Sequence, residues 1–468
     1  METQKLLMFP VWLSSFFFFF FFNSFSTEPL QYQYQAFFPT SLPEVTQDLE
    51  TLSWDMPQQF SDSESKMTSS STVVLYHIDH LSSDSNSTPE SLFLNRLQRD
   101  AIRVAAIATR TGNFSSPIIS GFSHGIGEYF TLIGVGTPPK PFYMILDTGS
   151  DLTWLECLPC ETCYHHQLDG IFVPTQSSSF ALVHCYDLLC YLLQYPLGSP
   201  QECNKQPDQH CLYEVQYGDG SFTKGELSTE TLTFGKTKVS KVPLGCGYQN
   251  KARIGSAAGL LGLGHGKLSL PNQVGINSFS YCLTDTSNSS SHSYLTFGNS
   301  VVSNNTIFTP LLRNPTYYYV ELLGISVGGK RVSGITPSLF NEGMIVDSGT
   351  TLTWLPQLAY EALRDAFLDA GASNLMRAPS VSILDTCFYV PENTTKVKVP
   401  TVELHFKDAD VSLPASNYMY PVDNNGTFCF AFANRTDGPF IIGNIQQQGF
   451  RVVYDLANNQ IGFAPNSC

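Results

Sequence analysis

The sequence predicts an all-β protein built from two similar lobes. A stretch of twelve residues, MILDTGSDLTWL (Met144 to Leu155), returns without a gap as MIVDSGTTLTWL (Met344 to Leu355), with eight of the twelve positions identical. From Gly127 onward, short apolar or aromatic runs alternate with turns rich in Gly, Pro, Asn and Ser, a spacing typical of β-strands. Duplication of a strand and turn at a distance of 200 residues indicates one copy in each lobe.

The expected strands follow one another through both lobes, which we place at residues 120–302 and 303–468. They are EYFTLIGVG, FYMILD, CLYEVQY, STETLTF, FSYCLT, SYLTFG, YYYVELLGISVGG, MIVDSG, TVELHF, TFCFAFA, FIIGNI and FRVVYDLANNQIGFA. One clear helix is expected from Pro356 to Ala370, because Pro suits its first turn and Gly371 its C-terminal end. The residues expected on its apolar face are Leu358, Ala362, Leu363, Ala366 and Phe367.

The residues before the lobes are interpreted as a signal peptide (1–26) and a prosegment (27–119). Lys5 precedes an apolar run from Leu6 to Phe22, and polar residues follow, as in a cleaved secretory signal; a signal anchor is the alternative. Residues 23 to about 72 lack a steady period and are expected to be a disordered spacer. A strand-like run (72–81) and an Arg-rich amphipathic helix (89–110) complete the prosegment. That helix either covers the active site or is simply a solvated helix.

Each copy of the repeated stretch contains an Asp at the end of an apolar strand, Asp147 in the first and Asp347 in the second. Two carboxylates brought face to face can share one proton, because like charges at that distance cannot both ionise. Such a pair can activate a water, polarise a carbonyl and protonate a leaving nitrogen, which is the chemistry that cleavage of a peptide bond requires.

These motifs resemble the two active-site loops of pepsin-like aspartic proteases, and two later apolar-apolar-Gly segments resemble the strands that cross those loops. The residues concerned are Asp147-Thr148-Gly149-Ser150 with Leu260-Leu261-Gly262, and Asp347-Ser348-Gly349-Thr350 with Ile441-Ile442-Gly443. The resemblance implies a bilobal pepsin-like fold with the active-site cleft between its lobes. It also implies that Thr148 and Ser348 cross-link the loops and that Ser150 and Thr350 hydrogen-bond the carboxylates. Gly149 and Gly349 allow the backbone to approach closely.

The segment Tyr217-Gly218-Asp219-Gly220-Ser221 resembles the hairpin flap that closes over substrate in this family. The resemblance implies that Tyr217 overhangs the scissile bond and that Trp154 receives the contact of its hydroxyl. Without the resemblance, Tyr217 is an ordinary aromatic residue beside a hairpin turn.

Twelve cysteines, all after residue 150, fit a secreted protein with six disulfides. Cys157, Cys160 and Cys163, followed by His165-His166, could instead hold zinc, but we expect disulfides, no metal and no cofactor. The cysteine pattern resembles the nepenthesin-type and guard-cell-type plant members of the family. That resemblance implies the pairs Cys157–Cys160, Cys163–Cys246, Cys185–Cys211, Cys190–Cys203, Cys282–Cys468 and Cys387–Cys429; sequence alone leaves the pairing open.

Charge and sequence signals narrow the location and the partners. The net charge is −15 and no basic patch stands out, so nucleic acid is not an expected partner. No lipid-anchor tail is expected, and we expect a monomer that acts on polypeptides, secreted to the cell wall space, with vacuole and plastid as alternatives. Glycosylation sequons occur at Asn86, Asn113, Asn288, Asn304, Asn393, Asn425 and Asn434.

The sequence thus predicts a secreted aspartic endopeptidase made as a zymogen. A second hypothesis is a catalytically silent relative that serves as a binding or inhibitor protein. Both Asp motifs and the flap Tyr are intact, and this favours the enzyme.

Overall fold

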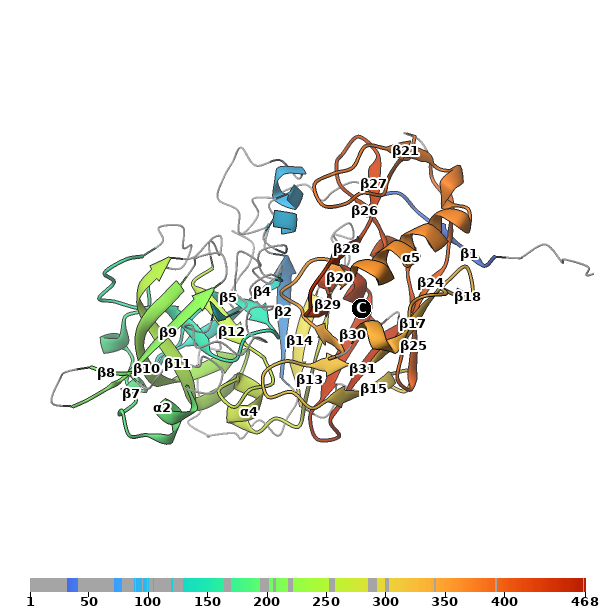
Figure 1. The fold of residues 1–468 in the computed structure, drawn as a ribbon. Helices are drawn as coiled ribbons and strands as arrows, with labels where there is room; N and C mark the ends of the chain where they lie inside the picture. The colour runs from blue at the N-terminus through green and yellow to red at the C-terminus, as the bar shows by residue number, and fades with distance from the viewer. Residues whose placement is uncertain are drawn as a thin grey trace, which may run out of the picture.

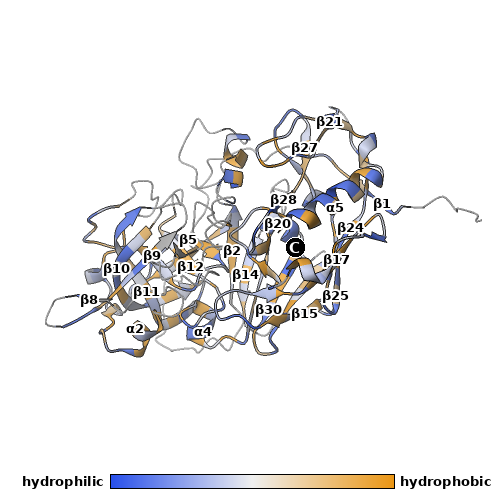
Figure 2. Cartoon of the chain, in the orientation of Figure 1, coloured by the Kyte–Doolittle hydropathy of each residue, from blue (hydrophilic) through white to orange (hydrophobic). Residues whose placement is uncertain are grey.

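The computed structural model describes residues 32–40, 71–77, 88, 90–94, 96–98, 100, 104, 119–120, 129–163, 170–193, 202–204, 208–217, 222–251, 257–284, 293–298, 303–340, 342–391, 394–465 and 467–468. It shows two β-rich lobes side by side (Figure 1). Strands in the middle of the molecule are largely coloured as hydrophobic in Figure 2, because strands buried on both faces are apolar throughout. The all-β, two-lobe prediction is confirmed.

The first lobe contains the strands on either side of Asp147. Strand β5 ends at Asp147, β6 follows the turn, and β12 runs parallel to β5 in the register Gly262↔Asp147. The strands of this lobe are β4 (Tyr129–Val135), β5 (Lys140–Asp147), β6 (Thr153–Glu156), β7 (Ala181–Leu182), β8 (Glu202–Cys203), β9 (Cys211–Tyr217), β10 (Phe222–Phe234), β11 (Thr237–Lys251), β12 (Gly259–Gly262), β13 (Ser278–Cys282) and β14 (Ser293–Phe297).

The second lobe repeats this arrangement around Asp347. Strand β29 runs parallel to β19, with Ile442 opposite Val346. Two four-stranded sheets, β18-β17-β24-β25 and β21-β22-β27-β26, extend the lobe. Its strands are β15 (Ile307–Leu312), β16 (Tyr319–Val320), β17 (Leu322–Val327), β18 (Lys330–Arg331), β19 (Met344–Val346), β20 (Thr353–Pro356), β21 (Met376–Ala378), β22 (Cys387–Tyr389), β23 (Val397–Pro400), β24 (Val402–Phe406), β25 (Ala409–Leu413), β26 (Met419–Pro421), β27 (Thr427–Phe430), β28 (Phe432–Arg435), β29 (Phe440–Ile442), β30 (Phe450–Asp455) and β31 (Gln460–Pro465).

One sheet joins the two lobes. Its successive pairs are β4–β2, β2–β14, β14–β13, β13–β30, β30–β31 and β31–β15. Strand β2 (Ser71–His77) comes from the expected prosegment, and Figure 1 shows it in blue between the lobes. The strand expected within residues 72–81 is therefore confirmed, and it lies inside the sheet that both lobes share.

Among the helices whose two ends are both described, only α5 exceeds five residues. They are α2 (Leu188–Leu192), α4 (Leu270–Val274), α5 (Gln357–Asp369) and α6 (Asn444–Gln447), with 3-10 turns at Pro174–Gln176, Pro337–Phe340, Ala372–Asn374 and Ala415–Asn417. Helix α5 lies where the sequence predicted a helix. Its face was predicted only in part: Leu363 and Phe367 are buried, but Leu358 is 66% exposed and Ala359 and Tyr360 take its place in the core. No described helix is long and apolar enough to cross a bilayer.

The prediction of a disordered spacer over residues 23 to about 72 is wrong for residues 32–40. Strand β1 (Tyr34–Phe37) pairs antiparallel with β23 of the second lobe. Composition misled the prediction, because Gln and Tyr alternate here and the apolar partners lie hundreds of residues away in the sequence.

All twelve cysteines form disulfides, but four of the six expected pairings are wrong. The structure has Cys157–Cys246, Cys160–Cys163, Cys185–Cys203, Cys190–Cys211, Cys282–Cys468 and Cys387–Cys429. The last two agree with the expectation. Cys157 bonds Cys246 rather than Cys160 because β6 and β11 are parallel neighbours, with Leu155 opposite Cys246.

Candidate active site

Asp147 and Asp347 occupy equivalent places at the ends of two buried strands. Asp147 is the last residue of β5 and Asp347 follows β19, and both residues are wholly buried. Each strand delivers its carboxyl group to a tight turn, so neither side chain is free to move far. The sequence motif and the backbone therefore place the two groups in the same way.

Each carboxylate is bound by a backbone N–H and a hydroxyl from its own turn. The N–H of Gly149 donates to Oδ1 of Asp147 (2.8 Å) and the Ser150 hydroxyl donates to Oδ2 (2.7 Å). In the second lobe Gly349 donates to Oδ1 of Asp347 (2.9 Å) and Thr350 to Oδ2 (2.7 Å). These bonds fix the plane of each carboxylate, as expected for Ser150 and Thr350.

The two turns are tied to one another through Thr148 and Ser348. The Ser348 N–H donates to the Thr148 hydroxyl (3.0 Å), and the Thr148 N–H donates to the Ser348 hydroxyl (3.3 Å). Each hydroxyl also reaches a carbonyl of the opposite strand, Thr148 that of Val346 (3.5 Å) and Ser348 that of Leu146 (3.4 Å). The structure thus brings the two motifs together, and the predicted cross-link is present.

Each crossing segment is hydrogen-bonded to the strand that follows the Asp turn of its own lobe. The N–H of Gly262 donates to the Thr153 hydroxyl and that of Gly443 to the Thr353 hydroxyl, both at 3.1 Å. A Cβ on Gly262 would lie 2.2 Å from the Asp151 carbonyl oxygen, and one on Gly443 would lie 2.3 Å from that of Leu352. Only glycine permits this approach, so both apolar-apolar-Gly segments serve the role expected of them.

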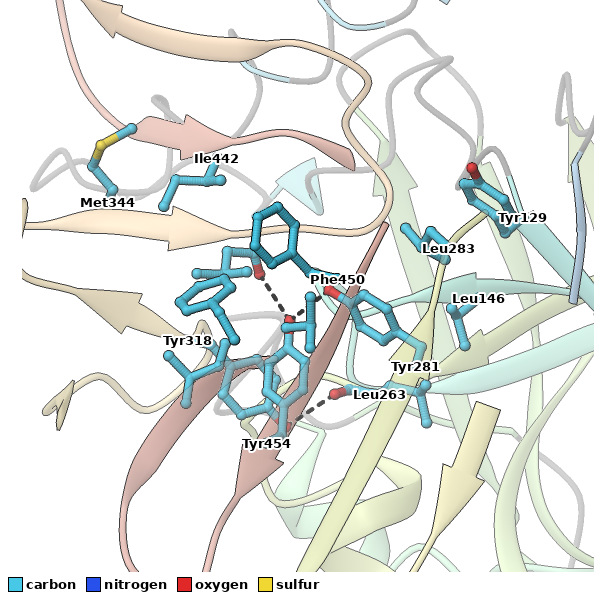
Figure 3. Packing of buried hydrophobic residues seen from close by; sticks show 14 of the residues in the cluster. Tyr129, Leu146, Leu263, Tyr281, Leu283, Tyr318, Met344, Ile442, Phe450 and Tyr454 are labelled. Carbon is cyan, nitrogen blue, oxygen red and sulfur yellow. Dashed lines mark hydrogen bonds between the residues drawn. The ribbon is translucent and has the colours of Figure 1, made fainter. Parts of the chain in front are cut away.

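A cluster of tyrosines packs beneath the second turn. Figure 3 shows Tyr281, Tyr318 and Tyr454 close together, with 4.5 Å between the ring centroids of Tyr318 and Tyr454. The Tyr281 and Tyr454 hydroxyls are 3.0 Å apart, and Tyr454 donates to the carbonyl of Val346 (3.4 Å). Burial raises the pKa of Tyr281 and of Tyr454 well above the ordinary value, so both phenols remain neutral. They add no negative charge beside Asp347.

Comparison with known proteins agrees with this geometry. Two family models match, described as Xylanase inhibitor N-terminal (residues 129–299) and Xylanase inhibitor C-terminal (residues 317–465). The chain is 55% identical over 426 residues to Aspartyl protease family protein 2 of Arabidopsis thaliana, covering 86% of both chains. It is 38% identical over 403 residues to Aspartic proteinase nepenthesin-1 of Nepenthes gracilis, covering 84% of this chain and 89% of the relative.

The chain belongs to the plant pepsin-like aspartic proteases. Among solved structures, soybean Basic 7S globulin shares the fold of this family member, with a TM-score of 0.56 and 20% identity over 73% of this chain and 91% of the globulin.

The expected flap is a hairpin between β9 and β10. Tyr217 is the last residue of β9, while Gly218 and the rest of the tip lie outside the described residues. Trp154 lies in β6, wholly buried. The contact expected between Tyr217 and Trp154 stays a prediction. The backbone of Ile119–Ser120 (β3) runs parallel to the flap strand, with Ser120 opposite Tyr217.

Sequence reasoning missed Asp100 as a residue of this site. Its carboxylate accepts the backbone N–H of Thr351 at Oδ1 (2.8 Å) and that of Leu352 at Oδ2 (2.7 Å), directly after the second Asp motif. Asp100 is 1% exposed and lies in a helical segment whose Phe93 and Leu97 are fully buried against the second lobe. Its sequence signal was an acid on the apolar stripe formed by residues 93, 97 and 104.

One arginine of the same segment, Arg96, is packed rather than exposed to solvent. Arg96 is 1% exposed, its guanidinium donates to the Tyr420 hydroxyl (3.3 Å), and it lies 5.1 Å from the ring of Phe93. Phe93 in turn stacks on Tyr420 (5.2 Å). The alternative of a simply solvated helix is therefore wrong for these residues, which are packed against the second lobe.

The cysteines considered as possible zinc ligands form disulfides instead. Glu156, Cys160 and Cys163 lie near one another, but the two sulfurs form a disulfide and have no thiolate to offer a metal. Cys157 bonds Cys246, while His165-His166 lie outside the described residues. Of the sequons, Asn304, Asn425 and Asn434 are exposed, and the other four lie outside the described residues.

Proposed function

We propose that the protein is a secreted aspartic endopeptidase that hydrolyses peptide bonds in polypeptides with a water placed between Asp147 and Asp347. The observation that carries the proposal is the reciprocal Thr148–Ser348 cross-link. It joins two turns in which the carboxylates are oriented by equivalent donors. A binding protein has no need of two such equivalent carboxylates.

The chemistry requires one ionised and one protonated carboxyl group. The ionised group takes a proton from the water as the water oxygen bonds to the scissile carbonyl carbon, and the protonated group gives its proton to the carbonyl oxygen. Transfer of a proton to the nitrogen then lets the carbon–nitrogen bond break, which releases an acid and an amine. Because the pair must keep one proton, activity should rise below about pH 6 and fade above neutrality.

The precursor form is proposed to be inactive because residues 90–104 hold the second catalytic turn. Asp100 binds the backbone at Thr351 and Leu352, four and five residues beyond Asp347. An ionised carboxylate accepts both N–H groups, whereas a protonated one loses part of its acceptor strength. Acidification, which protonates carboxylates, is therefore proposed to loosen the contact. Cleavage is proposed between residues 110 and 127.

Secretion to the cell wall space is supported by the six disulfides, because such bonds persist in oxidising compartments. The apolar N-terminal run fits a signal peptide of residues 1–26. The three exposed sequons are compatible with glycosylation on that route.

The test is acid-dependent cleavage of an unfolded protein by wild type, Asp147→Asn and Asp347→Asn. Asn is close to Asp in shape but cannot serve as a base, so both variants should lose activity by more than about 1,000-fold while their melting temperature stays near that of wild type. Exposed Asp369 supplies the matched control, Asp369→Asn, which should be fully active. Substantial turnover by Asp347→Asn would rule out the shared-proton pair.

The same assay separates the enzyme from the silent binding or inhibitor protein. Wild-type protein that folds, matures and still fails to cleave at any pH between 3 and 7 would leave binding as the function. No feature of the site favours that outcome, since both carboxylates and all four supporting hydroxyls are in place.

A further inference from the structure

Strand β1 lies against the second lobe, although hundreds of residues separate the two in the sequence (Figure 1). Its register with β23 runs from Tyr34↔Pro400 to Phe37↔Val397. Beyond the strand, the Gln33 N–H donates to the carbonyl of Gly328 (2.8 Å), and the Thr401 N–H donates to the carbonyl of Gln33 (3.2 Å). The segment thus forms a two-stranded antiparallel sheet with β23 on the second lobe, by the main-chain pairing through which extended peptides are bound.

Two side chains of β1 are inserted into the lobe. Phe37 is 2% exposed, belongs to the main hydrophobic core, and meets the ring of Phe428 edge-on at 5.0 Å. The Gln35 amide donates to the carbonyl of Leu413 (2.9 Å) and to the hydroxyl of Tyr418 (2.5 Å). By contrast, neighbouring Phe38 is 62% exposed. One aromatic and one amide, two residues apart, therefore make the specific contacts.

The lobe is shaped to receive this segment. The Gly328-Gly329 turn has φ of 58° and 77°, and a Cβ on these residues would lie 2.7 Å from Tyr32 and 2.6 Å from Gln33. Beside the turn, the buried Lys330 ammonium has no hydrogen-bond partner among the described residues and lies 3.7 Å from the centroid of the Tyr32 ring. A desolvated ammonium is attracted to the face of an aromatic ring, so an aromatic residue bound at this place stabilises the Lys330 side chain.

We propose that this edge of the second lobe, formed by Gly328-Gly329, Lys330, β23, Tyr418 and Phe428, is a binding site for an extended peptide with Gln two residues before an aromatic residue. In this protein residues 32–38 fill it and stay bound after the chain beyond residue 40 is cut. The active protein then carries a noncovalently held peptide at a place distinct from the Asp147–Asp347 site. The proposal goes beyond the peptidase activity and does not depend on it.

The test uses a full-length precursor without the signal peptide, carrying Asp147→Asn and Asp347→Asn so that it cannot cut itself. A recognition sequence for a site-specific protease is inserted within residues 41–70. After cleavage and gel filtration under native conditions, mass spectrometry should find the peptide that contains residues 32–40 with the protein. Quantitative loss of this peptide from a folded protein would overturn the proposal.

Peptide exchange then tests the specific contacts without altering the protein. A labelled synthetic peptide of residues 31–40 should exchange into the cleaved protein, and unlabelled peptides should compete with it. Phe37→Ala should weaken competition by roughly 100-fold or more and Gln35→Ala by roughly tenfold. The matched control, Phe38→Ala, should compete within about threefold of wild type because its ring is exposed. Equal competition by the Phe37 and Phe38 variants would refute the assigned contacts.

Discussion

The hydrogen bonds of Asp100 permit a quantitative prediction for the precursor. Asp100→Ala removes both acceptors from the buried N–H groups of Thr351 and Leu352, and Asp100→Asn leaves one. A hydrogen bond to a charged group contributes about 1.5–3 kcal/mol. We therefore expect the Asn substitution to destabilise the closed form of the precursor, relative to the opened form, by about 1.5–3 kcal/mol. The Ala substitution should destabilise it by roughly twice as much.

Converted to populations, a loss of about 1.5–3 kcal/mol raises the opened fraction of the precursor roughly 10- to 150-fold. The first readout is the initial rate at which freshly purified precursor cleaves a fluorogenic peptide. The second is amide hydrogen exchange over residues 344–356 in an Asp347→Asn background, which does not require activity. Both should increase in the order wild type, Asp100→Asn, Asp100→Ala.

The matched control is Glu90→Gln in the same helical segment. Glu90 also accepts a backbone N–H, that of Asn424 at 2.9 Å, but at an exposed position where water replaces the bond at little cost. The Glu90→Gln substitution should leave both the initial cleavage rate and the amide hydrogen exchange near the wild-type values. If Asp100→Ala is as inactive and as protected from exchange as wild type, Asp100 does not hold the second turn and the reasoning fails.

Three further predictions follow from the described contacts. Thr148→Val removes a hydroxyl from the cross-link between the turns, so it should lower peptidase activity at least tenfold and the free energy of unfolding by about 1–3 kcal/mol; wild-type values in both assays would contradict the role of the cross-link. Burial would raise the pKa of Asp385, but hydrogen bonds from Thr386, Tyr360 and Arg364 outweigh it and hold the pKa below the ordinary value. The resulting stabilisation is present above about pH 4 and is lost as pH falls further. Denaturant titration should therefore find Asp385→Asn destabilised by about 0.5–1 kcal/mol at pH 6 and by less at pH 3. An equal loss of stability at both pH values would contradict this prediction. Titration of the denatured, unreduced protein should detect no thiol, and stoichiometric zinc or several thiols would contradict the six disulfides.

The sequence was most informative where function is written locally. Each Asp of the proposed pair, its Gly and its hydroxyl residues are neighbours in the chain, so the repeated motif specifies each turn and its internal hydrogen bonds. Even the Thr148–Ser348 cross-link could be expected, because the family resemblance supplied the relation between the two copies. The fold class followed for a similar reason, since alternation of strands and turns is a short-range pattern.

Contacts that join distant parts of the chain were not accessible in this way. Cys203 and Cys211 illustrate the difficulty. They lie opposite one another on the paired strands β8 and β9, yet Cys203 forms its disulfide with Cys185 and Cys211 with Cys190. Strand β1 was missed because its edge partner lies some 360 residues away. The role of Asp100 was missed, since the sequence cannot show which backbone N–H groups need an acceptor.

Strand β2 has a consequence for how the protein acquires and keeps its structure. The strand lies within the sheet that joins the lobes, hydrogen-bonded to β4 on one side and to β14 on the other, both of which belong to the first lobe. In the full chain this strand is available as a template that holds β4 and β14 in one sheet. If the segment is cut free and lost, a chain that later unfolds has no template to return to. The persistence of the shortened protein would then be governed by its rate of unfolding rather than by an equilibrium.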